Sequence, residues 1–135
     1  LGSCYGTTGP LIVNIETGKP YYNHFPLVTV RDMVQAHILL RKHLAVEKIH
    51  VAIGGSLGGQ QVLEWAVTEP DVFENIIPIA TNAKHSAWGI AFNETQRMAL
   101  LADNTWGNES EHAANEGLKA ARAIAMLSYR NYITY

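Results

Sequence analysis

The sequence predicts an α/β fold, in which parallel strands alternate with helices. Three observations support this prediction. Residues 49–66 have the pattern of a short strand, a glycine-rich turn and an amphipathic helix, a second apolar run follows at residues 76–80, and helical patterns lie on both sides. A strand, a helix and a second strand in this order form one right-handed crossover of a parallel sheet.

The turn after the first strand is the most informative stretch. Gly54-Gly55-Ser56-Leu57-Gly58 matches G-x-S-x-G, the pattern of a nucleophile elbow. Small residues must flank the serine, because the strand and the helix nearly touch in such a strained turn. Before the turn, residues 51–53 form an apolar run typical of a strand buried on both faces. After it, apolar residues recur at helical spacing at Val62, Leu63, Ala66 and Val67.

The same turn is compatible with two simpler interpretations, a turn that only packs closely or one that binds a phosphate. Neither G-x-G-x-x-G nor the Lys-Ser/Thr pair that closes a P-loop is present, so the nucleotide interpretations are weak. The strand-turn-helix context favours Ser56 as a nucleophile over a purely structural turn.

Capping and helix-breaking residues place the helices on either side of the turn. A helix is predicted to begin at Thr29, with Asp32 as a variant of the capping box. Pro70 ends the helix that follows the elbow. His37 is expected to be a half-buried structural histidine. The apolar stripe of the first helix is expected to be Val30, Met33, Val34, Leu40 and Leu44.

The second half of the chain is predicted to contain one strand and two helices. The strand covers residues 76–80, where Pro78 argues against a fully paired central position. The helices cover residues 86–102 and a segment from a Ser110 cap to about residue 129. Two strands do not make a stable sheet alone, and both ends of the sequence look like loops. We therefore expect a piece of a longer chain.

The composition argues against several function classes. The 135 residues are 47% hydrophobic and 16% charged, as in a globular protein. A net charge of −2 without a basic cluster gives no indication of nucleic acid or an anionic membrane as a partner. No apolar stretch is long enough to span a bilayer, and no metal-binding pattern is present. The single cysteine, Cys4, fits a reducing cytoplasm.

A nucleophilic serine needs a base and an acid that orients the base, and in an elbow these follow in the order Ser, acid, His. After Ser56 the chain offers Asp71, Asp103, His85 and His112. Asp71 lies at the end of the elbow helix away from the serine. His85 precedes Asp103, and His112 falls inside a predicted helix. The triad is therefore expected to be incomplete in this chain.

The oxyanion hole is half visible in the sequence. The backbone N–H of Leu57 is expected to be one donor, and the second comes from a loop after an earlier strand. Thr7 and Thr8, in the turn-rich first 26 residues, could present hydroxyls to a ligand, although such residues more often close their own turns.

Nine stretches spread over the chain together carry a family resemblance. They are Gly6–Pro10, Phe25-Pro26, Thr29–Met33, Gly54–Gly59, Leu63–Ala66, Ile77–Thr81, His85-Ser86, Ala91–Glu94 and Ser128–Arg130. The combination resembles the homoserine O-acetyltransferase family. The resemblance implies an α/β-hydrolase fold, present here in part as the elbow strand and helix, the following strand and the start of a helical lid. Residues 1–85 would then belong to the core, and residues 86–135 would lead into the lid.

The resemblance also implies a reaction. Ser56 would take an acetyl group from acetyl-CoA, and the hydroxyl of L-homoserine would accept it in a ping-pong mechanism of methionine biosynthesis, without a further cofactor. Arg122 and Tyr129 match positions that contact the substrate, and a guanidinium can bind the homoserine carboxylate bidentately. An ordinary salt bridge of Arg122 and a buried lid aromatic at Tyr129 are equally open. The implied protein is a cytoplasmic homodimer joined through the lid.

The sequence departs from the family pattern in three ways. The catalytic Asp and His of the family come after Tyr135, its first strands come before Leu1, and Gln60 replaces a common Met. A succinyl-CoA-dependent relative, a serine or antibiotic O-acetyltransferase, a serine esterase and an inactive truncated fragment stay open as alternatives.

Overall fold

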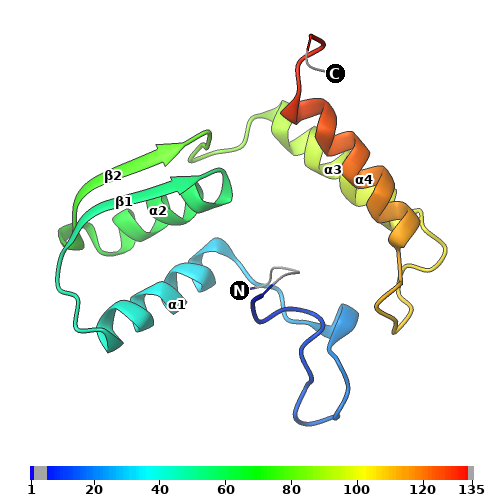
Figure 1. The fold of residues 1–135 in the computed structure, drawn as a ribbon, viewed down its shortest axis with the longest axis horizontal. Helices are drawn as coiled ribbons and strands as arrows, with labels where there is room; N and C mark the ends of the chain where they lie inside the picture. Colours follow the sequence, from blue (N-terminus) through cyan, green and yellow to red (C-terminus); the bar gives the residue numbers. More distant parts are fainter. Residues whose placement is uncertain (2–5, 134–135) are drawn as a thin grey trace. The chain divides into compact units, whose positions relative to one another are not determined.

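The structure is a computed structural model, which describes residue 1 and residues 6–133. It divides into two compact units, and each is described by itself. One unit is formed by residues 26–84 together with Leu1, and the other by residues 6–25 and 85–133. Figure 1 shows the elements of both units. Cys4, which the sequence placed in a reducing compartment, lies outside the described residues.

The first unit is an α/β crossover. Its elements are α1 (Val30–His43), β1 (Ile49–Gly55), α2 (Leu57–Thr68), the short 3-10 helix η2 (Pro70–Val72) and β2 (Phe73–Ile79). The strands pair in parallel, from Ile49 opposite Phe73 to Gly55 opposite Ile79, and α2 packs against both of them (Figure 1). The predicted strand, helix and parallel strand are therefore confirmed.

The second strand differs from its prediction in length and pairing. It begins at Phe73, three residues before the predicted start, and it ends at Ile79. Pro78 lies within the paired region, opposite Gly54. Proline is tolerated here because β2 is an edge strand of the described sheet. On that edge no described strand needs a hydrogen bond from the N–H that proline lacks.

The expectation that the first strand is buried on both faces is wrong for the described residues. The side chains of Val51 and Ile53 are 40% and 64% exposed. The physical reason is that the described sheet has two strands and that α2 is the helix that packs on it. The opposite face of the sheet is therefore not covered within this unit.

The predicted start of α1 is confirmed in detail. The Thr29 hydroxyl oxygen accepts a hydrogen bond from the Asp32 N–H, and the Asp32 carboxylate accepts one from the Thr29 N–H, at 3.3 and 2.8 Å. This reciprocal pair is a capping box. The helix then packs on α2.

The predicted apolar stripe of α1 is only partly right. Val34 and Ile38 are buried, whereas Leu40 and Leu44 are 56% and 61% exposed. A single neighbouring helix covers only a narrow face at i and i+4, so the wider stripe that the sequence suggested stays in solvent. His37 is half-buried as predicted: its Nε2 lies 2.8 Å from Gln61 Oε1, and its ring stacks on Trp65.

The second unit is built on two paired helices, α3 (Ala87–Leu101) and α4 (Asn115–Tyr129), which pack along each other. Small residues line the α4 side of this contact, where Gly117, Ala121 and Ala125 are buried at intervals of four. The N-terminal segment contributes the 3-10 helix η1 (Tyr22–His24) and a bridge between Val13 and Pro20. The predicted division at residues 85 and 86 is close to the boundary at residue 84, but residues 6–25 group with the helices.

The starts of α3 and α4 differ in whether a serine caps them. The helix predicted over residues 86–102 is confirmed as α3, and Ser86 caps it by accepting a hydrogen bond from the Gly89 N–H at 3.2 Å. The predicted Ser110 cap of the last helix is wrong, because α4 begins at Asn115, after a turn-rich stretch. Ser110 Oγ instead accepts from the His112 N–H within that stretch. A serine that can bond its own neighbours closes a local turn as readily as it caps a helix.

Candidate active site

Ser56 occupies the junction between β1 and α2 in a strained backbone conformation. Its φ of 52° and ψ of −118° lie in a region that side-chain-bearing residues rarely adopt. The Ser56 N–H donates to Ile79 O at 2.9 Å, and its carbonyl accepts from the Thr81 hydroxyl at 2.8 Å. These bonds to β2 and to the residues after it hold the strain in place. Ser56 itself is exposed, as an elbow nucleophile requires.

Glycines make this sharp turn sterically possible, but only one of the two that the motif contains is needed for steric reasons. A Cβ on Gly54 would overlap the Gly58 carbonyl and lie 2.8 Å from Gly59 N, so β1 and α2 touch there. A Cβ on Gly59 would lie 2.5 Å from Thr81 Cγ2. A Cβ on Gly58 meets nothing within 4 Å. The close approach therefore needs Gly54 and Gly59, and Gly58 contributes its backbone alone.

The Leu57 N–H is placed as the sequence predicted, at the first position of α2. The first N–H groups of a helix have no acceptor within the helix, and the helix dipole favours negative charge at this end. A donor beside Ser56 with these properties is suited to an oxyanion. The role of Leu57 as an oxyanion donor stays a prediction.

Within the unit that contains Ser56, the described residues do not supply it with a base. His37 is held by Gln61 and Trp65, and no described histidine of this unit forms a hydrogen bond with Ser56 Oγ. Asp71 lies in η2, where its carbonyl accepts from Lys48. His85 and His112 lie in the helical unit. The incomplete triad stays a prediction.

Arg122 and Tyr129, the two predicted substrate contacts, line one cavity of the helical unit. It measures about 270 Å³, and α3 contributes Trp88, Phe92 and Gln96 to its wall. No acidic residue lines the cavity, and none of the described ion pairs involves Arg122. A guanidinium without a carboxylate partner beside aromatic rings is suited to an anionic ligand. Substrate binding by these two residues stays a prediction.

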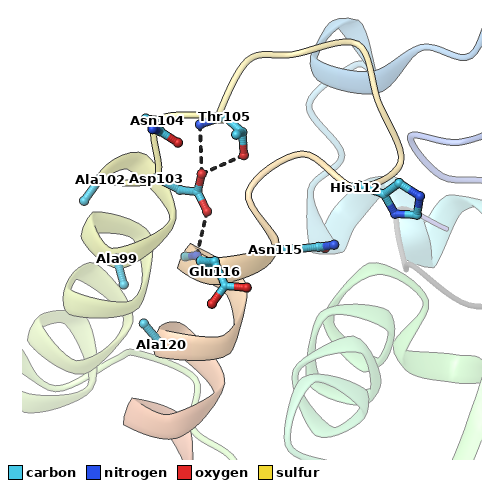
Figure 2. Close-up of a pocket in the computed structure, with 10 residues that line it drawn as sticks. Ala99, Ala102, Asp103, Asn104, Thr105, His112, Asn115, Glu116 and Ala120 are labelled. Carbon is cyan, nitrogen blue, oxygen red and sulfur yellow. Dashed lines mark hydrogen bonds between the residues drawn. The ribbon is translucent and has the colours of Figure 1, made fainter.

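Asp103 has a structural role that the sequence did not predict. Figure 2 shows its carboxylate between Thr105 and the first turn of α4. It accepts hydrogen bonds from the Thr105 hydroxyl at 2.6 Å, the Thr105 N–H at 2.8 Å and the Gly117 N–H at 2.8 Å. These donors favour the charged form and lower the pKa of Asp103 from its usual 3.8 to about 2. Asp103 therefore caps α4 in this structure.

The lowered pKa of Asp103 predicts a pH dependence of stability. The folded pKa lies below the unfolded one, so the stabilisation is complete above the ordinary pKa and is lost as the pH falls through about 4 towards about 2. In the full-length protein, the unfolding free energies of the wild type and Asp103→Asn should differ most near neutral pH and converge in acid. Denaturant unfolding at a series of pH values measures this, and a difference that is constant over the series would contradict it.

Three functional features were missed in the sequence: Thr81, Gly59 and Asp103. Each acts through a residue at least 14 positions away, as in the contacts of Thr81 with Ser56 and of Asp103 with Gly117. The only local signal was the second glycine pair of the turn, which the motif does not require.

Within the described part of the chain, no group of three or more metal-binding side chains comes together. None of the described helices combines the length and the hydropathy needed to cross a membrane.

A family model described as the alpha/beta hydrolase fold matches residues 1–124. A similar curated protein is the homoserine O-acetyltransferase of Cyclobacterium marinum, 56% identical over 135 residues, which are all of this chain and 38% of that protein. The homoserine O-acetyltransferase of Trichormus variabilis is 48% identical over 138 aligned positions, with the same coverage. The chain thus spans less than half the length of these relatives.

Solved structures show the same architecture. The crystal structure of homoserine O-acetyltransferase from Bacillus anthracis superposes with a TM-score of 0.84 at 28% identity, over 90% of this chain and 33% of that chain. The acetyl esterase MekB superposes with a TM-score of 0.75 at 30% identity, over 82% and 33%.

Proposed function

Because the chain belongs to the alpha/beta hydrolase fold family, we propose that its protein moves an acetyl group from acetyl-CoA to the hydroxyl of L-homoserine. The observation that carries the proposal is the exposed Ser56 at the strained junction of β1 and α2. The homoserine O-acetyltransferases at 48% and 56% identity support the choice of acyl transfer to homoserine.

The proposed mechanism has two acyl transfers. Ser56 Oγ attacks the thioester carbonyl of acetyl-CoA, the C–S bond breaks, and the proton from the serine passes through a base to the departing thiol. The homoserine hydroxyl then attacks the acetyl-serine carbonyl, the ester bond to Ser56 breaks, and the serine regains a proton. In this proposal a His and an Asp of the whole protein serve as the base and its orienting acid, as the resemblance implies.

Charge develops on the acetyl oxygen in both transition states. The Leu57 N–H at the start of α2 would donate to this oxygen. One such donor contributes about 3–4 kcal/mol in serine enzymes. The uncompensated Arg122 would bind the homoserine carboxylate, with Tyr129 beside it in the same cavity. A cytoplasmic homodimer in methionine biosynthesis is part of the same proposal.

A serine esterase is the second candidate. The acetyl esterase at 30% identity favours it, because the same elbow makes an esterase when water reaches the acyl-enzyme. The two candidates differ only in which hydroxyl deacylates Ser56.

Thiol release from acetyl-CoA by the full-length protein, measured with and without L-homoserine, separates the two candidates. We expect release to be slow alone and to be stimulated at least about tenfold by homoserine, because the amino acid is the better-positioned acceptor. Serine and 4-hydroxybutyrate serve as control acceptors, and succinyl-CoA as control donor. Release at the same rate without homoserine would rule out the transferase.

A further inference from the structure

The start of α4 is unusual because its own sequence provides no cap. Ala114, at the N-cap position, has no side-chain acceptor and adopts a left-handed conformation with a φ of 57°. The missing acceptors come from the loop after α3. Asp103 accepts from the Gly117 N–H at 2.8 Å, and the Thr105 hydroxyl oxygen accepts from the Ala114 N–H at 2.8 Å. The loop after α3 and the start of α4 are thus joined by two hydrogen bonds, and the one to the Asp103 carboxylate is charge-assisted.

The two helix backbones approach each other closely at the same place. A Cβ on Gly117 would lie 2.7 Å from Ala99 O and 3.0 Å from the Cα of Leu100. One and two turns further along α4, Ala121 and Ala125 are buried on the same face. The buried face of α4 consists of small residues, which interlock little with α3. The hydrogen bond from the Gly117 N–H to Asp103 therefore helps to fix the position of α4 on α3.

The position of α4 on α3 determines the shape of the Arg122 cavity. Arg122 directly follows the buried Ala121, and its side chain lines the cavity from α4. Trp88 and Gln96 line it from α3. A small slide or rotation of α4 would therefore move the guanidinium relative to the wall of α3. A displacement of about 1 Å is already enough to weaken the contact between a positioned group and its ligand.

We propose that Asp103 is a positioning residue for the acceptor substrate: by capping α4 from the end of α3, it places Arg122 in the cavity that receives the homoserine carboxylate. The inference rests on the proposed function for the identity of the substrate. Asp103 acts through Arg122 and touches neither substrate. It should therefore affect the second half-reaction and leave acetylation of Ser56 unchanged.

The test uses the full-length protein and steady-state kinetics with acetyl-CoA and homoserine. Asp103→Ala should raise KM for homoserine on the order of tenfold, with kcat and the rate of acetyl-enzyme formation close to wild type. Asp103→Asn keeps an oxygen acceptor for the Gly117 N–H and should restore most of the affinity. Ser110→Ala is the matched control, because Ser110 Oγ accepts within the preceding turns and bonds no residue of α4.

A double-mutant cycle separates positioning from plain stabilisation. If Asp103 acts through Arg122, Asp103→Ala should add no further increase in KM when Arg122 is already alanine. Fully additive effects on KM, or a lower Tm with an unchanged KM, would overturn the inference.

The outcome is also distinguishable from a failure of the proposed function. If homoserine does not stimulate thiol release by the wild type, the transferase proposal fails. Amide hydrogen exchange then tests the positioning role of Asp103 independently of the substrate. Asp103→Ala should speed exchange in the α4 turn that contains Arg122, and Ser110→Ala should not. Unchanged exchange there would overturn the positioning role.

Discussion

Replacing Ser56 with alanine in the full-length protein should abolish formation of the acetyl-enzyme and lower acetyl transfer by at least about a thousandfold. The serine oxygen is the atom that takes the acetyl group, and among the described residues no other serine or threonine has a positive φ. Intact mass after mixing with acetyl-CoA measures the step, because the wild type should gain the mass of one acetyl group.

The control for this experiment is a serine that is exposed and lies outside the elbow. Ser110→Ala should keep the acetyl-enzyme signal, since Ser110 only closes a local turn. Ser56→Ala should also leave the fold intact, because the backbone bonds to Ile79 and Thr81 do not use the side chain. An acetylation signal that persists in Ser56→Ala would rule out this serine as the nucleophile.

The second large effect is expected at Gly54. A methyl group there would overlap the Gly58 carbonyl, so either the elbow or the pairing of β1 must shift. Overpacking against backbone typically costs about 1–3 kcal/mol, and here it also moves the serine. Gly54→Ala should therefore lose both stability and acetyl-enzyme formation, measured by denaturant unfolding and by intact mass.

Gly58→Ala provides a matched control in the same motif. A Cβ at this position meets nothing within 4 Å, and Gly58 lies in the first turn of α2. Alanine is the better helix former by up to about 1 kcal/mol, so this variant should be as stable as the wild type or more stable. Equal losses at Gly54 and Gly58 would show that the steric reading of the elbow is wrong.

Local patterns were sufficient for the elements whose bonds are local. Thr29 and Asp32 of the capping box are three positions apart, so this helix start could be predicted from spacing. The crossover of β1, α2 and β2 was readable from periodicity. The same kind of reasoning failed at Ser110, because two competing local bonds were possible and the sequence does not say which forms.

The sequence by itself determined the strand-turn-helix around Ser56, the likeness to acyltransferases, and Arg122 and Tyr129 as candidate substrate contacts. Only the tertiary structure decided that Gly59 and not Gly58 is the second close contact, that Thr81 supports the serine, and that Asp103 caps α4. The physical reason is that these contacts join residues distant in sequence. A helical period or a motif indicates the local conformation that one segment favours. Which distant backbone group contacts that segment depends on tertiary packing.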